Sequence, residues 1–353
     1  MSLMSVSRVR DRILGGVEPL PEEQVSIYEA RGRILSEMLV ARRSQPPFDA
    51  SAMDGYALRS ADIRSVPVKL TLIGRSSAGH GFRGEVGRGQ AVRIFTGAPV
   101  PPGADTVVIQ ENARPAQDGC VEILESAGEG RNIRSRGYDF KEGDRLLAKG
   151  TRLEARHLML AAAMNYAAVP VHRKPVVALL ANGDELVPPG ADPDRDQIIS
   201  SIPAALFPAV EAWGGSPLLL GIAGDDSESL AAEIKAAAHA DILVTIGGAS
   251  VGEHDLVRGV LERSGAQFEV LKAAIRPGKP VMFGFKGDQR IVSLPGNPIS
   301  ALVCALVFLK PLIERLSGVC TPQVPPLELP RLAPLYRNGD REHYLRAIRS
   351  TSG

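Results

Sequence analysis

The chain has 353 residues, of which 44% are apolar and 23% charged, so it can form two or more globular domains with a sizeable core. Lysine and arginine number 41 against 40 aspartates and glutamates, which excludes a global field favouring nucleic acid or a membrane surface. The cysteines, Cys120, Cys304 and Cys320, lie far apart without metal-type spacing, as is typical of a reducing compartment. The N-terminus carries no secretory-signal pattern, and the longest apolar run, residues 301–309, is shorter than the ~20 residues that span a bilayer. We therefore expect a cytoplasmic protein.

The first half of the chain predicts helices around a β region. Residues 1–45 carry helical spacing with interleaved charges, whereas residues 46–138 contain short strand-like runs between glycines and prolines. Residues 139–172 return to helical spacing. Thr151 and Glu154 there have the spacing of a capping box, which predicts that a helix begins after Thr151.

The second half has a different pattern. Residues 173–321 alternate short runs rich in valine, isoleucine and leucine with longer helical segments. This alternation predicts βαβ units, that is, a parallel sheet covered by helices on both faces. A proline-rich stretch and a short strand-like tail follow, and we expect the domain formed by this tail to be incomplete.

Glycines and acidic residues follow three successive predicted strands. The carboxyl ends of parallel strands meet at one edge of a sheet, where ligands bind, so we expect these residues to gather there. Glycine allows positive φ angles and a close approach of backbone N–H groups to an anion. The residues are Gly183, Asp184 and Glu185; Gly224, Asp225 and Asp226; and Gly247 and Gly248, which lead to Glu253 and Asp255.

A fourth predicted strand ends in Pro295-Gly296-Asn297-Pro298. Asn297 is a plausible N-cap with proline at the first helical position, so this turn would offer N–H groups and a positive dipole end to an anion. The basic residues Lys272, Arg276 and Lys279 lie shortly before it in the sequence. Phosphate or another oxyanion suits such a set. Carboxylates that converge beside an anion site repel one another and suit Mg²⁺ with oxygen ligands, which indicates metal-assisted phosphoryl chemistry.

Structural interpretations compete at each of these places. A single Gly-Asp after a strand is usually turn chemistry, and His254 is more often a surface residue than a catalytic base. The arginines of GRNIRSRG, residues 130–137, are typical of a solvated basic run, and SAMDGYA, residues 51–57, of a turn before a strand. The phosphate-binding GxxxxGK[ST] pattern is absent, and no GxGxxG follows the first strand.

Seven motifs in one order over nearly the whole chain resemble the molybdopterin molybdenumtransferase family, which includes MoeA and the gephyrin E domain. They are PPFDASAMDGYALR (46–59), RIFTGAPVPPGADTVVIQEN (93–112), NIRSRGYD (132–139), NGDEL (182–186), GGASVGEHD (247–255), RPGKP (276–280) and LPGNPIS (294–300).

The resemblance implies a multidomain α+β protein. Its main part would be an α/β three-layer, parallel-sheet molybdopterin-binding domain at 173–321. An inserted β domain would occupy 46–138, and a discontinuous helical linking domain 1–45 with 139–172. A small C-terminal β domain, 322–353, would be incomplete.

The implied activity is the insertion of molybdate into adenylylated molybdopterin, with Mg²⁺-dependent release of AMP. Family members are homodimers whose active cleft is shared between subunits, and a molybdopterin adenylyltransferase acts upstream of them. No nucleic acid or membrane partner is implied. Two alternatives stay open: molybdopterin adenylylation itself, and a non-catalytic molybdopterin-binding or scaffolding paralogue.

By resemblance, the functional residues fall into three groups. The catalytic group is Asp54, Thr96, Asp139, Glu185, Asp255, Lys272, Arg276 and Lys279. The group that binds the pterin or phosphates is Gly183, Asp184, Gly247, Gly248, Ser250, Gly252, Pro295, Gly296, Asn297 and Ser300. The Mg²⁺ group is Glu185, Asp225, Asp226 and Asp255.

The sequence departs from the family pattern at several positions. Ala181 and Asn182 stand where the family usually has serine and threonine, and Ile246 stands where it usually has serine. These differences remove hydroxyl groups that could bind a phosphate or the pterin. Arg276 replaces a common lysine, which keeps the charge but changes its geometry.

Overall fold

The computed structural model describes residues 3–247, 256–278, 280–319 and 339–347, without the side chains of residues 270–272 and 280. Among these residues, no helix combines the length and the apolar composition that a bilayer span requires.

The chain forms two compact units. The α/β unit comprises Met1–Glu37, Lys149–Glu154 and Val169–Gly353, and the β unit comprises Met38–Ala148 and Ala155–Ala168. The finer division into four domains stays a prediction.

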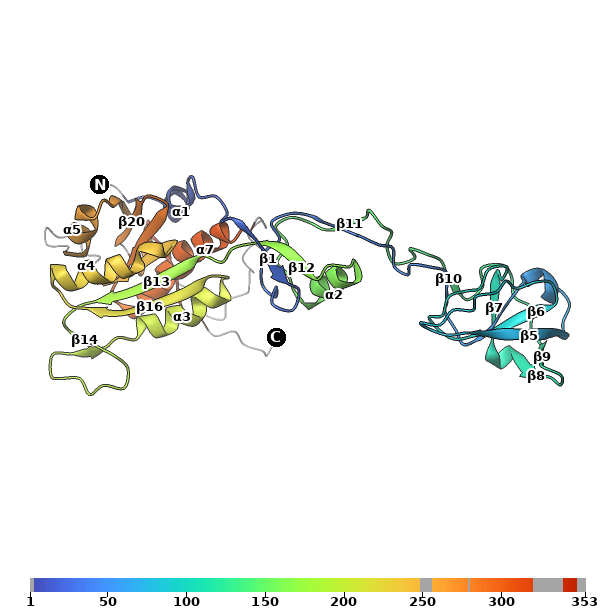
Figure 1. Ribbon diagram of the computed structural model, residues 1–353. Helices are drawn as coiled ribbons and strands as arrows, with labels where there is room; N and C mark the ends of the chain where they lie inside the picture. The colour runs from blue at the N-terminus through green and yellow to red at the C-terminus, as the bar shows by residue number, and fades with distance from the viewer. Residues whose placement is uncertain (1–2, 248–255, 279, 320–338, 348–353) are drawn as a thin grey trace. The chain divides into compact units, whose positions relative to one another are not determined.

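A six-stranded sheet in the order β16-β13-β17-β21-β20-β18 forms the centre of the α/β unit (Figure 1). The first four strands of this order are parallel to one another, as predicted, whereas β20 pairs antiparallel with both β21 and β18. The antiparallel pairing of β20 and β21 follows from the two-residue turn Gly287-Asp288, in which Gly287 has a φ of +57°. The strands are β13 (Val176–Asn182), β16 (Ser216–Ala223), β17 (Ile242–Ile246), β18 (Gln267–Lys272), β20 (Pro280–Lys286) and β21 (Gln289–Leu294).

Helices cover both faces of this sheet, which confirms the three-layer prediction. One face packs against α1, α3 and the continuous helical stretch α6-η4-α7, and the other against α4 and α5. The elements are α1 (Val6–Leu14), α3 (Ile202–Ala212), α4 (Ser227–Ala236), α5 (Leu256–Arg263), α6 (Pro298–Cys304), the π-helical turn η4 (Ala305–Leu309) and α7 (Lys310–Leu316).

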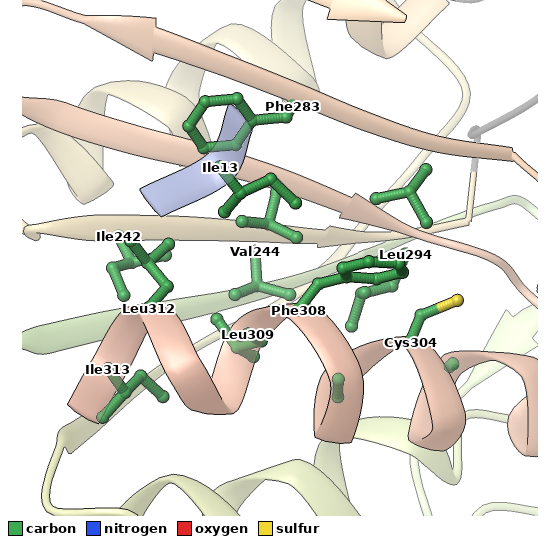
Figure 2. Close-up of a cluster of buried hydrophobic side chains, with 14 of the residues drawn as sticks. Ile13, Ile242, Val244, Phe283, Leu294, Cys304, Phe308, Leu309, Leu312 and Ile313 are labelled. Atoms are coloured by element: carbon green, nitrogen blue, oxygen red, sulfur yellow. The ribbon is translucent and has the colours of Figure 1, made fainter. Parts of the chain in front are cut away.

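The larger core joins the N-terminal helix α1 to the sheet and to the helical stretch α6-η4-α7. Figure 2 shows Ile13 of α1 beside Phe283 of β20, with Phe308 of the π-helical turn among the side chains of the sheet. Cys304 lies in the same cluster, and burial raises the pKa of its thiol to about 12. This thiol therefore stays protonated at neutral pH, in keeping with a structural cysteine.

The β unit is built on a second six-stranded sheet, in the order β7-β4-β6-β5-β9-β8. Strands β5 and β6 are parallel, and the other neighbours are antiparallel. Two apolar clusters, one around Leu58 and one around Ile94, form its core, and the predicted β region is thus confirmed. The strands are β4 (Gly55–Leu58), β5 (Val68–Ser76), β6 (Gln90–Ile94), β7 (Thr106–Ile109), β8 (Ala113–Pro115) and β9 (Cys120–Ile123).

The prediction of continuing helix over residues 15–45 is wrong. The first helix ends at Leu14, and Glu22–Ser26 forms strand β1, which pairs with β12 (Ala168–His172). This partner lies more than a hundred residues away in the sequence, so local periodicity does not reveal the pairing.

The predicted helix start after Thr151 is also wrong, because α2 runs only over Ala155–Ala163. The Thr151 carbonyl accepts a hydrogen bond from the Leu35 N–H at 3.0 Å, and Arg152 forms a β-bridge with Ile34. Pairing with a distant segment has replaced capping here.

Replacing Phe308 by alanine tests the larger core. The side chain is fully buried, so we expect Phe308→Ala to lower the free energy of unfolding of the α/β unit by about 3–5 kcal/mol, as measured by urea denaturation. Leu306→Ala is the matched control, because Leu306 lies in the same helical turn but is 52% exposed. Its expected loss is about 0.5 kcal/mol, and equal losses for the two variants would contradict the packing described.

Candidate functional site

Four parallel strands of the α/β unit end side by side. Asn182 at the end of β13 pairs in register with Ala223 of β16, and Ile246 of β17 pairs with Leu294 of β21. Ala181 and Ile246 join the two pairs. We call the turns that follow these strands, residues 183–185, 224–226, 247 and 295–297, the rim.

The turns after β13 and β16 are bound to each other. Gly183 has a φ of +144° and donates its N–H to the Ala223 carbonyl at 3.1 Å. The Asp225 N–H donates to Asp184 Oδ1 at 2.9 Å, and the Asp184 N–H donates to Asp225 Oδ2 at 3.4 Å. The two acidic turns therefore form one unit with exposed carboxylates.

The acidic residues of the rim differ in their hydrogen-bond partners and in their exposure. Asp226 is the N-cap of α4, and its Oδ1 accepts from the N–H groups of Glu228 at 2.9 Å and Ser229 at 2.8 Å. Glu185 is exposed, and its carboxylate lies over Gly183, where a Cβ would come within 2.3 Å of Glu185 Oε2. Among the described residues, three or more His, Cys, Asp or Glu side chains nowhere cluster in a way that could hold a metal ion.

The turns after β17 and β21 also meet. Gly247, with a φ of +96°, donates its N–H to the Leu294 carbonyl at 3.1 Å, and a Cβ on Gly296 would lie 3.7 Å from Gly247 Cα. Asn297 is the N-cap of α6, as predicted, because its Oδ1 accepts from the Ser300 N–H at 3.1 Å and the Ser300 hydroxyl at 3.2 Å. The first turn of α6 thus begins at the rim.

The basic turn at 276–278 packs against α6. A Cβ on Gly278, which has a φ of +107°, would lie 2.4 Å from Cys304 Sγ and 3.5 Å from the Ser300 carbonyl oxygen. Arg276 is exposed and belongs to the short strand β19 (Ile275–Arg276), which pairs in parallel with β22 (Glu342–His343). Arg276 and Ser300 therefore belong to neighbouring segments.

A pocket of about 80 Å³ opens between the turns after β13, β17 and β21. Its wall is mainly apolar, and its polar side chains include Asn182, Glu185 and Ser200. The wall consists of Asn182, Glu185, Leu186, Ile198, Ile199, Ser200, Ser201, Ile202, Ile246, Gly247, Gly296 and Pro298.

Some residues predicted from the sequence lie outside the described part of the chain. They are Gly248, Ser250, Gly252, Asp255 and Lys279, together with the side chain of Lys272.

In the β unit, the structure brings Asp54 and Thr96 together. The Thr96 N–H and hydroxyl both donate to Asp54 Oδ1 at 2.8 Å. The backbone N–H of Thr96, followed by its hydroxyl, lowers the pKa of Asp54, and the charge of Arg93 lowers it further. Asp54 is therefore an accessible, firmly ionised carboxylate at neutral pH.

Asp139 does not join this pair. Residues 133–140 run antiparallel to residues 45–51, with Ile133 paired to Ser51 and Phe140 to Gln45. The Asp139 N–H donates to the Gln45 carbonyl at 2.9 Å, which places Asp139 at the opposite end of this ladder from the segment that leads to Asp54.

Sequence reasoning gave no role to two features of these sites. Asn182 appeared only as the loss of a hydroxyl, although this residue lines the pocket at the rim. Arg131 belongs to the run interpreted as solvated, but it borders a hollow of about 350 Å³ in the β unit, together with Met53 and Asn132.

Comparison with known proteins covers most of the chain. Residues 4–165 match the MoeA N-terminal region (domain I and II), and residues 178–315 match a probable molybdopterin binding domain.

The molybdopterin molybdenumtransferase of Haemophilus influenzae is 37% identical over 318 residues, which cover 90% of this chain and 78% of the relative. That of Nostoc sp. is 36% identical over 332 residues, covering 92% of this chain and 76% of the relative. The crystal structure of the molybdopterin biosynthesis MoeA protein from Pyrococcus horikosii superposes with a TM-score of 0.80 at 33% identity, covering 90% of this chain and 81% of that one. Identity above 30% over nine-tenths of the chain and a shared fold lead to one conclusion: the chain belongs to the molybdopterin molybdenumtransferase family.

Proposed function

We propose that this protein inserts molybdate into adenylylated molybdopterin and releases AMP in a Mg²⁺-dependent reaction, giving the molybdenum cofactor. The observation that carries the proposal is the rim, where acidic turns, close-packed glycines and the capped start of α6 meet at the ends of four parallel strands. The family to which the chain belongs supports the substrate assignment.

Basic and acidic residues at the rim have different roles in this proposal. Backbone N–H groups at Gly296 and Ile299, together with Lys272, Arg276 and Lys279, bind anionic oxygens of molybdate or phosphate in this proposal. The two turns require glycine for different reasons: Gly183 has a φ of +144°, which other residues rarely adopt, and a Cβ on Gly247 would lie 2.8 Å from the Asn182 carbonyl oxygen.

The acidic residues are suitable magnesium ligands, because their side-chain donor atoms are oxygens, which Mg²⁺ prefers. Glu185, Asp225 and Asp255 would hold the ion. We choose Asp225 over Asp226 because Asp226 Oδ1 caps α4 with two hydrogen bonds of 2.8–2.9 Å, whereas Asp225 Oδ2 accepts one long hydrogen bond of 3.4 Å. The ion would offset negative charge that develops on the phosphoryl oxygens as AMP leaves.

Asp54 and Thr96 act, in this proposal, from the second subunit of a homodimer, together with Asp139. The accessible, ionised Asp54 suits the binding of a hydroxyl, an amine or a metal-bound water. A molybdopterin adenylyltransferase would supply the adenylylated substrate in the cytoplasm.

The activity is tested by mixing the protein with Mg²⁺, molybdate and adenylylated molybdopterin and following AMP. We expect AMP release that depends on both molybdate and Mg²⁺. A folded protein that releases no AMP under these conditions, or that instead consumes ATP to adenylylate molybdopterin, would refute the proposal.

Glu185→Gln tests the role of the acidic turn. The exchange keeps the size of the side chain but removes its charge, so we expect molybdate-dependent AMP release to slow about 10- to 100-fold and to need more Mg²⁺. Asp192→Asn is the matched control, because it removes a charge from an exposed position of the loop that follows β14 (Leu186–Val187). If the two variants react equally fast, Glu185 is not a ligand.

Thr96→Val tests the ionisation of Asp54. The variant loses the hydroxyl donor but keeps the backbone N–H, so the pKa of Asp54 should rise part of the way toward its ordinary value, as measured by carboxyl ¹³C NMR titration. A lowered carboxyl pKa stabilises the folded state above the ordinary pKa, and this stabilisation is lost as the pH falls through the folded value. The stability gap between wild type and variant should therefore close at acidic pH. Thr71→Val, at an exposed position of β5, should leave the titration unchanged.

A further inference from the structure

Two buried side-chain atoms of the described residues have no hydrogen-bond partner, namely Asn182 Oδ1 and His172 Nε2. The case of His172 has a local explanation. Its Nδ1 is 2.8 Å from the Leu20 carbonyl oxygen, and the ring borders a hollow of about 10 Å³, the size that one water molecule needs. Asn182 is different, because it faces the larger pocket at the rim.

Asn182 as a residue is only 7% exposed, and its buried Oδ1 accepts no hydrogen bond from any residue that the structure describes. A buried amide oxygen left in this state costs stability, because it has lost its hydrogen bonds to water and gained none in return. Such a group is typical of a site where a ligand supplies the missing partner.

The pocket wall indicates the shape of that ligand. Ile198, Ile202 and Ile246 provide apolar surface, while Gly247 and Gly296 add no side chains to the wall. The volume of about 80 Å³ is small beside the ~300–1,000 Å³ of pockets that enclose whole ligands. It therefore takes the edge of a flat ring rather than an entire nucleotide.

We propose that the Asn182 carboxamide binds a heteroaromatic ring edge that carries a hydrogen-bond donor next to an acceptor. The side-chain oxygen accepts an N–H of the ring or of its exocyclic amino group, and the side-chain NH₂ donates to a neighbouring ring nitrogen or carbonyl oxygen. This inference rests on the proposed function, whose substrate offers two such edges: the pyrimidinone of the pterin and the adenine of the nucleotide. Asparagine pairs with adenine in this two-bond manner in other proteins.

The experiment compares two buried polar side chains of the same sheet. Asn182→Leu keeps the branched side-chain skeleton but makes no hydrogen bonds. Thr245→Val removes a fully buried hydroxyl that donates to Ser293 Oγ at 2.8 Å. Thermal unfolding is measured for both variants, together with equilibrium binding of AMP, molybdopterin and adenylylated molybdopterin without molybdate.

Opposite effects are expected for the two variants. Asn182→Leu should unfold at the wild-type temperature or above it, because no hydrogen bond is lost in the free protein, while its Kd for adenylylated molybdopterin rises about tenfold or more. Thr245→Val should unfold about 2–4 °C lower, because Ser293 loses its partner, with unchanged ligand binding. A parallel loss of AMP affinity in Asn182→Leu assigns the adenine edge, and a loss of molybdopterin affinity assigns the pterin edge.

The outcomes that overturn the inference are distinct from those that overturn the function. If Asn182→Leu binds adenylylated molybdopterin as tightly as wild type, or if it unfolds several degrees lower with unchanged affinity, Asn182 is not a ligand-binding residue. If the wild-type protein binds none of the three compounds, the proposed function and the role of Asn182 both fail.

Discussion

The candidate site depends on the register of four parallel strands. β16, β13, β17 and β21 end at matching heights because their backbone pairing continues to the last residue of each strand. Each following turn then meets its neighbour through short contacts, such as the exchange of hydrogen bonds between Asp184 and Asp225. A slip of two residues in one strand would keep the core face buried but would move its turn out of reach of the others. The chemistry of the rim is therefore a consequence of the packing below it.

Much of this arrangement could be predicted from the sequence, because it depends on local signals. The alternation of apolar strands and helices indicated the three-layer half, and Asn297 followed by Pro298 indicated the start of α6. Glycines after the strands indicated the narrow turns, and both Gly183 and Gly247 have positive φ angles. In each case the residues that carry the signal also form the structure.

The remainder could not be predicted, because it depends on distant partners. Strand β1 exists through its pairing with β12, and Thr151 serves a β-bridge segment rather than a helix cap. The pocket role of Asn182 depends on Ile202 and Gly296, which lie far along the chain. A sequence comparison detects the missing hydroxyl at position 182, but only the assembled rim shows a carboxamide buried without a partner.

The anchoring of the N-terminal segment has a consequence for the order of folding during synthesis. Backbone hydrogen bonds join Met4 to Ala274 and Leu20 to Leu316, and Arg315 Nε donates to the Val17 carbonyl at 3.0 Å. Arg315 lies 298 residues after Val17, and Ala274 and Leu316 are similarly distant, so these partners are synthesised long after the first helix. The first helix therefore lacks its packing partners until most of the α/β unit has been translated. The β unit, in contrast, draws all its residues from the stretch between Met38 and Ala168 and has its complete sheet much earlier. The β unit can therefore fold on the nascent chain before the N-terminal helix α1 has the α/β surface on which it packs.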